Sequence, residues 1–403
     1  MNILFFDHPQ LRKSLLPLTY TRPVAGLRIG ILTIVEKWEQ VYQLKAGYIT
    51  QEYLTESYPE SSGESNLLIN GAACPSKDLL KAVDDLDMDC ALMQEGLLLA
   101  LRTDKKGQAL FAEKGDFEAK DIIEYYGDAN IIRYPWDIFR YNAAEIVSDF
   151  ELVTKDRSSS GVQDKHTIVY NESKVFVEPG VIIRAAVINA EEGPVYIGKD
   201  AHIHEGAKIK GPFAMCEGSY VNMDGKMRGG TTIGPYCKVG GEINNTVIFG
   251  NSNKGHEGYL GNSVIGEWCN FGADTNNSNL KNNYGEVKLW SYDQEGFLPT
   301  GLQFCGLIMG DHSKCGINTM FNTGTVIGVS ANIFGAGYQP NFIPSFSWGG
   351  VGGSKTFQLE KACEVAGLVI ERRGESFDKV QRSILEQVFK ISAPYRTWEN
   401  KNK

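Results

Sequence analysis

A six-residue period in the middle of the chain constrains the fold more than any other feature. Aliphatic residues fall six positions apart without interruption at Ile197, Ile203, Ile209, Met215, Val221, Met227, Ile233 and Val239. Small or medium residues recur between them at Ala201, Ala207, Ser219, Gly225, Thr231 and Cys237. Neither the 3.6-residue period of a helix nor the two-residue period of a strand explains this spacing. A period of six predicts a parallel β-helix whose aliphatic side chains point inward, one coil stacked on the next.

Two segments interrupt this pattern, at 245–263 and at 277–305. The second contains Tyr284–Tyr292, which we expect to form a protruding hairpin. Because neighbouring coils cover each repeat, both interruptions should loop outward and leave the core intact. Outward loops on a rigid scaffold are also where binding residues are expected.

The first part of the chain has a different pattern. Apolar runs predict strands, and apolar residues at helical spacing predict helices. The predicted strands are Ile3–Asp7, Asn66–Gly71 and a hairpin over 91–101 around Gly96, and the predicted helices are Ile31–Tyr42 and Lys77–Asp84. Strands that alternate with helices predict an α/β domain.

The final segment, Phe357–Trp398, again has helical spacing and is predicted to cap the open end of the β-helix. The predicted domains are therefore an α/β domain over 1–155, a β-helix over 156–354 and a helical tail over 355–403.

Composition argues against several classes of protein. The net charge of −9 disfavours nucleic acid as a partner. The eight cysteines form no CxxC pair and indicate buried thiols in a reducing compartment. The beginning of the chain has no basic segment followed by a long apolar run, so we expect neither a signal peptide nor a membrane-spanning helix. These features predict a cytoplasmic protein that does not bind membranes.

The segment Gly255–Asn279 carries specific motifs. It reads Gly-His-Glu-Gly-Tyr-Leu-Gly over 255–261, then Asn-Phe-Gly-Ala-Asp-Thr over 270–275, then Ser278-Asn279. This resembles the acetyltransferase half of the GlmU-like family, hexapeptide-repeat acyltransferases that join a sugar-phosphate nucleotidyltransferase to a glucosamine-1-phosphate N-acetyltransferase. The resemblance covers most of the chain as a divergent member, strongest at 195–340, and implies a left-handed β-helix behind a nucleotidyltransferase-like domain.

The resemblance implies roles for several residues. His256 would be the catalytic base, and Asn279 would orient it. Tyr259 and Asn270 would bind the acceptor, and Gly272-Ala273 would contact acetyl-coenzyme A. Taken singly, His256 reads as a solvated loop histidine, and Asn279 as a turn residue.

This chain departs from the family at the residues that bind the acceptor phosphate. It has Gly240-Gly241-Glu242 where the family has adjacent lysines. Arg228, Lys238 and Lys254 are nearby basic candidates, and a solvated surface role is an equal alternative for each. Arg228 and Lys254 are retained as predicted substrate-binding residues.

The predicted α/β domain lacks the family's glycine-rich phosphate loop. In its place, Arg22, Gly26, Arg28, Gly30 and Lys37 surround a helix N-terminus and are candidate nucleotide-binding residues. A structural loop is an equal alternative. Asn142 resembles one of the family's two metal ligands, which makes Mg²⁺ an expected cofactor if this domain is active.

The first functional hypothesis is a GlmU-like transferase that acetylates an amino-sugar phosphate of the glucosamine 1-phosphate class with acetyl-coenzyme A. It would also form UDP-N-acetylglucosamine or a related sugar nucleotide from UTP or another nucleoside triphosphate. The alternative is a nucleotidyltransferase for another sugar 1-phosphate, with a regulatory or oligomerising β-helix. A third is a non-catalytic scaffold. The resemblance implies a homotrimer.

Overall fold

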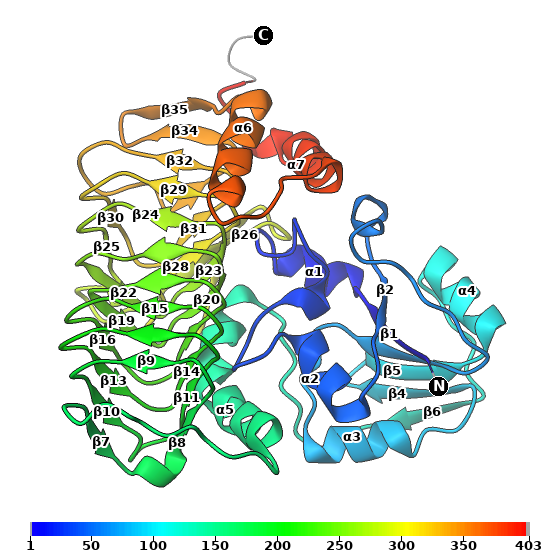
Figure 1. The fold of residues 1–403 in the computed structure, drawn as a ribbon. Helices are drawn as coiled ribbons and strands as arrows, with labels where there is room; N and C mark the ends of the chain where they lie inside the picture. Colours follow the sequence, from blue (N-terminus) through cyan, green and yellow to red (C-terminus); the bar gives the residue numbers. More distant parts are fainter. Residues whose placement is uncertain (1, 400–403) are drawn as a thin grey trace. The chain divides into compact units, whose positions relative to one another are not determined.

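A computed structural model of the chain describes residues 2–399. The chain forms two compact units (Figure 1). The first comprises Met1–Leu15, Thr21–Leu27 and Leu32–Tyr134, and the second comprises Leu16–Tyr20, Arg28–Ile31 and Pro135–Lys403. Within residues 2–399, no helix combines the length and the apolar character that crossing a membrane requires.

The first unit is an α/β domain around a mixed sheet with strand order β2-β1-β3-β5-β4-β6. The strands are β1 (Asn2–Phe6), β2 (Gly47–Ile49), β3 (Asn66–Asn70), β4 (Cys90–Gln94), β5 (Leu97–Thr103) and β6 (Asp121–Glu124). The helices are α1 (Pro9–Ser14), α2 (Ile34–Tyr42), α3 (Lys77–Asp84) and α4 (Lys105–Lys114), with 3₁₀ turns η1 (Val24–Gly26) and η2 (Glu52–Leu54). Leu4, Leu68 and Phe111 pack in its core.

The predicted strands and helices of this unit are confirmed. Gly96 turns the hairpin between β4 and β5 with a positive φ of 79°. Helix α2 begins later than predicted because Thr33 caps it. The Thr33 hydroxyl accepts from the Glu36 backbone N–H, and the Glu36 carboxylate accepts from the Thr33 N–H in return.

The second unit is built on a parallel β-solenoid with three walls (Figure 1). Wall 1 consists of β7 (Ile168–Tyr170), β10 (Val187–Asn189), β13 (Lys208–Lys210), β16 (Lys226–Met227), β19 (Glu242–Asn244) and β22 (Tyr259–Gly261). Wall 2 consists of β8 (Val175–Val177), β11 (Val195–Ile197), β14 (Phe213–Met215), β17 (Thr231–Ile233), β20 (Val247–Gly250), β23 (Val264–Glu267), β28 (Leu307–Met309), β31 (Thr325–Ile327) and β33 (Phe342–Ile343).

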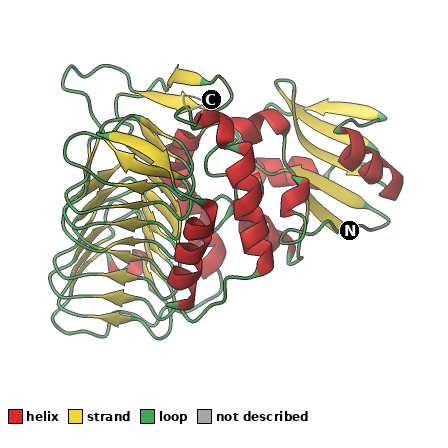
Figure 2. Ribbon diagram, turned by 90° about the horizontal axis from the view of Figure 1, so that it is seen from above, coloured by secondary structure: helices red, strands yellow, loops and turns green. Residues whose placement is uncertain are grey.

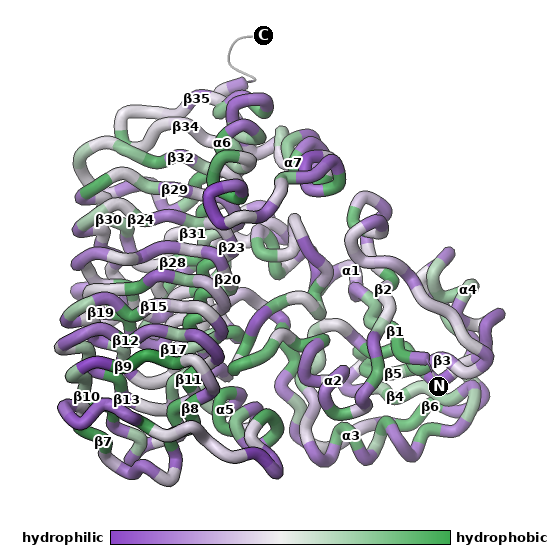
Figure 3. Tube along the Cα trace, viewed as in Figure 1, coloured by the Kyte–Doolittle hydropathy of each residue, from purple (hydrophilic) through white to green (hydrophobic). Residues whose placement is uncertain are grey.

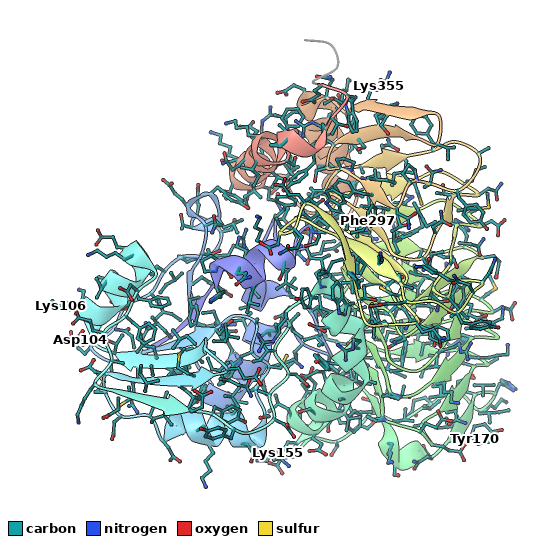
Figure 4. All side chains as sticks on the ribbon, turned by 180° about the vertical axis from the view of Figure 1, so that it is seen from behind. Asp104, Lys106, Lys155, Tyr170, Phe297 and Lys355 are labelled. Carbon is teal, nitrogen blue, oxygen red and sulfur yellow. The ribbon has the colours of Figure 1, made fainter. Side chains whose placement is uncertain are left out.

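Wall 3 consists of β9 (Ile182–Ile183), β12 (His202–Ile203), β15 (Tyr220–Val221), β18 (Lys238–Val239), β21 (Asn253–Lys254), β24 (Asn270–Phe271), β29 (Lys314–Cys315), β32 (Asn332–Ile333), β34 (Ser347–Gly350) and β35 (Gly353–Thr356). Figure 2 shows these short strands separated by loops at the corners. Tyr170 in β7 and Lys355 in β35, both labelled in Figure 4, mark the first and last strands of the solenoid.

The six-residue period is confirmed as a parallel β-helix. All eight aliphatic residues of the repeat are buried in one core. Hydrophobic and hydrophilic segments alternate along the coils (Figure 3). Equivalent inward residues pair between coils, as Ile203 with Val221 and Val221 with Val239.

The predicted outward loop at 245–263 is wrong. Strands β19 to β22 keep the chain within the three walls there, and Val239 pairs with Lys254 on the next coil. This coil has fewer residues than its regular neighbours because its corners are tighter, so the period is lost while the structure continues.

The second interruption does leave the solenoid. It follows a short strand, β25 (Asn276–Asn277), which still pairs in parallel with β30 (Met320–Phe321) of the solenoid. It contains an antiparallel hairpin of β26 (Lys288–Ser291) and β27 (Gly296–Pro299). The protruding hairpin is therefore confirmed, somewhat further along the chain than predicted. Phe297, labelled in Figure 4, lies on it and is half exposed.

Helices cover two of the walls. Helix α5 (Pro135–Thr154) packs on β14, β17, β20 and β23 of wall 2 and belongs to the second unit. The predicted boundary at 155 places this helix in the first domain. The tail forms α6 (Leu359–Glu371) and α7 (Lys379–Ile391), and 3₁₀ turns occur at η3 (Glu172–Lys174) and η4 (Ala393–Tyr395).

The tail contacts the last coil, and its covering of the open end of the β-helix stays a prediction. The ring of Phe389 in α7 lies 4.9 Å from the ring of Phe346, between β33 and β34. The end of α6 reaches wall 3, where the Arg373 guanidinium donates to the carbonyl oxygen of Tyr236 and to Asn253 Oδ1, each at 3.0 Å.

Candidate functional site

A cavity of about 860 Å³ lies on wall 3 of the second unit, beside the end of α6. Strands β18, β21, β24 and β29, the corner at 255–256 and residues 368–373 contribute its lining. Four of the predicted site residues line it: His256, Asn270, Gly272 and Ala273. The structure thus brings together the predicted base, one predicted acceptor-binding residue and the predicted cofactor contact.

His256 lies at the corner that joins β21 to β22, and its side chain is exposed. Within residues 2–399 its imidazole makes no hydrogen bond and no ion pair. The backbone of the corner is held firmly, because Asn222 Nδ2 donates to the carbonyl oxygen of Gly255 at 2.8 Å. A fixed corner therefore presents an imidazole whose nitrogens remain available to a ligand.

Lys254 holds the same corner from inside the solenoid. It occupies an inward position, between Val239 and Phe271, and is only 2% exposed. Its Nζ donates to the carbonyl oxygens of His256 at 2.6 Å and Glu257 at 2.9 Å. Burial lowers the pKa of this ammonium to about 8. The prediction that Lys254 binds substrate is therefore corrected: the side chain supports the His256 corner.

Tyr259 and Asn279 form a separate cluster and do not line the cavity. Asn279 Nδ2 donates to the Tyr259 hydroxyl at 2.9 Å and to Asn262 Oδ1 at 2.7 Å. The Tyr259 ring lies over Gly261, where an added Cβ would approach its hydroxyl to 2.3 Å. The amide of Asn279 thus positions Tyr259, and it makes no hydrogen bond to His256.

Arg228 lies on wall 1 and is not among the residues that line the cavity. Its Nη1 is 3.2 Å from a carboxylate oxygen of Glu242, and both side chains are well exposed. This is a surface ion pair of the kind that contributes little to stability.

The loop at Gly272-Ala273 has two backbone N–H donors, and they differ in whether the protein itself supplies an acceptor. The Gly272 N–H donates to the carbonyl oxygen of Cys315 at 3.0 Å, so it is used by the solenoid. The Ala273 N–H has no acceptor within residues 2–399. A side chain at position 272 would collide with the backbone of Gly316, which explains the glycine. Ala273 is therefore the donor that a bound molecule can use.

The five predicted nucleotide-binding residues belong to two different units. Arg22, Gly26 and Lys37 lie in the first, and Arg28 and Gly30 lie in the second. Arg22 and Lys37 are 5% and 1% exposed. Gly26 ends the 3₁₀ turn η1. These cations are buried within the protein and are not displayed around an open loop.

Arg28 and Gly30 serve the packing of wall 2. The Arg28 Nε donates to the carbonyl oxygen of Phe249 at 3.1 Å, and a guanidinium nitrogen donates to the carbonyl oxygen of Ile31. The Gly30 N–H donates to Asn142 Oδ1 at 2.7 Å. Gly30 has a positive φ of 75°, and a Cβ there would collide with Asp149.

The predicted magnesium ligand does not fit a metal site. Asn142 in α5 is fully buried, and its Nδ2 donates to the carbonyl oxygen of Gly230 at 2.8 Å and to Thr232 Oγ1 at 3.0 Å. With its Oδ1 bound to Gly30, the whole amide is used in joining α5 to wall 2. Residues 2–399 also contain no group of three or more His, Cys, Asp or Glu side chains that could hold a metal.

Comparison with known proteins gives a match to a family model over the first part of the chain. Residues 3–158 match a family model described as sugar nucleotidyl transferase. The chain is also similar to solved structures of UDP-N-acetylglucosamine acyltransferases from Francisella novicida and Campylobacter jejuni, at 14% and 16% identity. These cover 57% and 56% of this chain and 75% and 84% of theirs, with TM-scores of 0.26 and 0.22. No curated protein matches.

In the first unit, β2 and β3 flank β1 on opposite sides, which makes the end of β1 the expected ligand crevice. Asp7 follows β1 there, and its carboxylate accepts from Arg12 Nη1 at 2.9 Å and from the Val24 N–H at 2.7 Å.

Sequence reasoning missed several residues of the cavity. Trp268, Lys314, Arg372 and Arg373 line it together with the predicted residues. The adjacent arginines are visible in the sequence after the apolar pattern of the tail. What the sequence does not show is that α6 lies along wall 3 and brings them to His256.

Proposed function

We propose that this chain is a sugar-directed transferase whose solenoid acetylates the amino group of an amino-sugar phosphate, with acetyl-coenzyme A as donor and His256 as general base. The match of residues 3–158 to a sugar nucleotidyl transferase family supports the sugar as the common substrate of both units. The observation that carries the proposal is the exposed His256 imidazole, without a partner in residues 2–399, on the lining of a large cavity.

The chemistry requires one base at this position. The neutral amine attacks the thioester carbonyl carbon, the C–N bond forms, and the C–S bond breaks to release coenzyme A. The nitrogen must lose a proton as the amide forms, and a histidine can accept it near neutral pH and return it to the departing thiolate. The Ala273 N–H would donate to the carbonyl oxygen as its negative charge develops.

Asn279 takes a different part in this proposal from the one that the resemblance implies. Because its amide is bound to Tyr259 and Asn262, it acts through Tyr259 rather than on the imidazole. The base is oriented by its corner, which Lys254 and Asn222 hold through backbone carbonyls.

The test measures the release of free coenzyme A by the purified chain. The acceptors are glucosamine 1-phosphate, galactosamine 1-phosphate and glucosamine 6-phosphate. The His256→Ala variant should lose roughly 10²- to 10⁴-fold in rate, the usual contribution of a general base. The matched control is His204→Ala, a partly exposed histidine next to β12 that does not line the cavity. Equal losses in both variants, or none in His256→Ala, would refute the assignment.

The second candidate is a sugar nucleotidyltransferase whose solenoid does not catalyse. The family match supports it directly. It would be favoured if the chain makes a sugar nucleotide from a sugar 1-phosphate and a nucleoside triphosphate while no acceptor of the panel releases coenzyme A.

A further inference from the structure

Four cationic side chains line the wall 3 cavity, and no carboxylate does. Lys238 and Lys314 come from β18 and β29, and Arg372 and Arg373 come from the end of α6. None of the four forms an ion pair within residues 2–399. The chain as a whole has a net charge of −9, so a cavity lined by cations alone is a local reversal of charge.

Two of these cations are held by the protein. Arg373 donates to the carbonyl oxygen of Tyr236 and to Asn253 Oδ1 at 3.0 Å each, which fastens the end of α6 to wall 3. Lys314 Nζ donates to the carbonyl oxygen of His312 at 2.9 Å. Both residues retain further donors, because a guanidinium has five and an ammonium three.

The other two cations are exposed. Arg372 makes no hydrogen bond from its side chain within residues 2–399. The Lys238 ammonium lies 5.1 Å from the centre of the Tyr220 ring, a contact that orients the charge without using its donors. The cavity therefore combines two anchored cations with two whose donors are available.

A simpler explanation covers only half of the cluster. Cations at the C-terminal end of a helix stabilise its dipole, and Arg372 is the C-cap of α6. This accounts for the arginines but not for Lys238 and Lys314, which belong to strands of the solenoid. It also does not explain the absence of acidic residues from the lining.

The corner at Gly240-Gly241, which stacks on the corner that carries His256, cannot carry the lysines that the related family has there. Position 240 is glycine, and an added Cβ there would lie 2.5 Å from the carbonyl oxygen of Gly255. A lysine side chain would collide with the backbone of the corner that carries His256. A phosphate bound near His256 must therefore find its cations elsewhere around the cavity.

We propose that Lys238, Lys314, Arg372 and Arg373 form a phosphate-binding subsite, with α6 supplying the two arginines that wall 3 lacks. The inference rests on the proposed function, because the subsite shares a cavity with His256 and would hold the anionic part of a substrate. The phosphate is either that of the amino-sugar acceptor or one of those on the acyl donor. Arginine is suited to either because its planar fork binds phosphate oxygens in pairs.

The test compares ligands with and without phosphate by isothermal titration calorimetry on the full chain. One pair is glucosamine 1-phosphate and glucosamine, and the other is coenzyme A and 3′-dephospho-coenzyme A. The variants are Arg372→Gln and Lys238→Gln, both at exposed positions, so each should fold as the wild type does. The control is Lys361→Gln, an exposed lysine on α6 that does not line the cavity.

Arg372→Gln should weaken binding of one phosphate-bearing ligand by roughly 10- to 100-fold, as expected for a lost charged hydrogen bond. The ligand whose affinity falls identifies the molecule whose phosphate occupies the subsite. Its phosphate-free counterpart should bind Arg372→Gln and the wild type equally. The subsite is refuted if Arg372→Gln and Lys238→Gln change neither affinity more than Lys361→Gln does, or if the wild type binds neither phosphate-bearing ligand.

The same measurements separate this inference from the proposed function. If phosphate binding depends on Arg372 but the wild type releases no coenzyme A, the subsite stands and the acetyl transfer fails. If coenzyme A release depends on His256 but affinity does not depend on the four cations, the acetyl transfer stands and the subsite fails.

Discussion

Two walls of the same solenoid are each covered by a helix, with opposite results for their polar residues. On wall 2, α5 and the segment Arg28–Ile31 pack closely, and the amide of Asn142 is fully buried and completely hydrogen-bonded. On wall 3, the end of α6 leaves a cavity, and His256 and Arg372 face it with no internal partner in residues 2–399.

The difference separates structural polar groups from candidate functional ones. A buried polar group that finds all its partners within the chain stabilises packing and has nothing left for a ligand. An exposed group in a cavity without internal partners costs the fold little and can bind. Substitutions on wall 2 should therefore change stability, and those on wall 3 should change binding or rate.

The largest effect on stability should come from Asn142→Ala. The change leaves the Gly30 N–H and the Gly230 carbonyl buried without partners, at about 1–3 kcal/mol each. We expect the free energy of unfolding, measured in urea, to fall by roughly 2–5 kcal/mol in total.

The control for this variant is Ser148→Ala, at an exposed position of the same helix. It should differ from the wild type by less than about 0.5 kcal/mol. An Asn142→Ala protein of wild-type stability that loses magnesium-dependent nucleotidyl transfer would restore the metal-ligand interpretation and break the comparison.

Much of the fold follows from the sequence because a six-residue period determines which side chains point into the solenoid. Each inward residue must stack on its equivalent, so Ile203, Val221 and Val239 predict one another. The prediction fails at 245–263, where tighter corners shorten a coil and remove the period without removing the strands. It also misses α5, whose apolar face is matched to wall 2 rather than to a repeat.

The candidate site is less predictable, since neighbouring residues on a corner point in different directions. His256 and Tyr259 are three positions apart, yet one lines the cavity and the other is held by Asn279 outside it. Lys254 reads as a surface cation until the register places it between Val239 and Phe271. Arg372 reaches the site only through the tertiary position of α6. Which of these residues bind or catalyse stays a prediction.

The second prediction concerns Lys254, which lies inside wall 3. Like the buried polar groups on wall 2, its side chain is buried and hydrogen-bonded within the chain. Its pKa is lowered from 10.5 to about 8, mainly by burial. Below pH 8 Lys254 is charged in the folded state, and the burial of this charge lowers the free energy of unfolding by its full amount. Between pH 8 and 10.5 the unfolded chain binds more protons than the folded chain, so this cost is relieved and stability rises with pH.

Lys254→Met removes this titration, so its stability relative to the wild type should fall by roughly 2–3 kcal/mol between pH 8 and 10.5. Burial also raises the pKa of the Cys237 and Cys269 thiols above that of the same thiols in the unfolded chain, so these groups too make stability depend on pH in this range. They are common to both proteins and cancel in the difference. A difference that does not change with pH would mean that Lys254 is neither buried nor shifted.

The third prediction concerns the cluster of Tyr259 and Asn279, which does not line the cavity. Tyr259→Phe removes the hydroxyl that accepts from Asn279 at 2.9 Å, while Asn279 keeps its bond to Asn262. We expect a loss of about 0.5–1.5 kcal/mol in the free energy of unfolding, typical of one neutral hydrogen bond. Phe297→Leu, on the protruding hairpin, is an aromatic control outside the cluster. Unchanged stability with a collapse of acetylation would instead show that Tyr259 contacts the acceptor directly.

The smallest effect on stability should come from Asn270→Ala, which lies on wall 3, where polar groups face the cavity. Asn270 is exposed on the cavity lining, and the only hydrogen bond of its side chain within residues 2–399 is a long one of 3.5 Å from Asn253 Nδ2. The free energy of unfolding should therefore stay within about 0.5 kcal/mol of the wild type. The value of kcat/KM for acetylation should fall by roughly 2- to 12-fold, which corresponds to one neutral hydrogen bond to the acceptor. Asn282→Ala, an exposed asparagine of the second interruption, should change neither quantity. If Asn270→Ala instead destabilises the chain as much as Asn142→Ala does, exposure on wall 3 does not distinguish binding residues from structural ones, and the contrast between the two walls is lost.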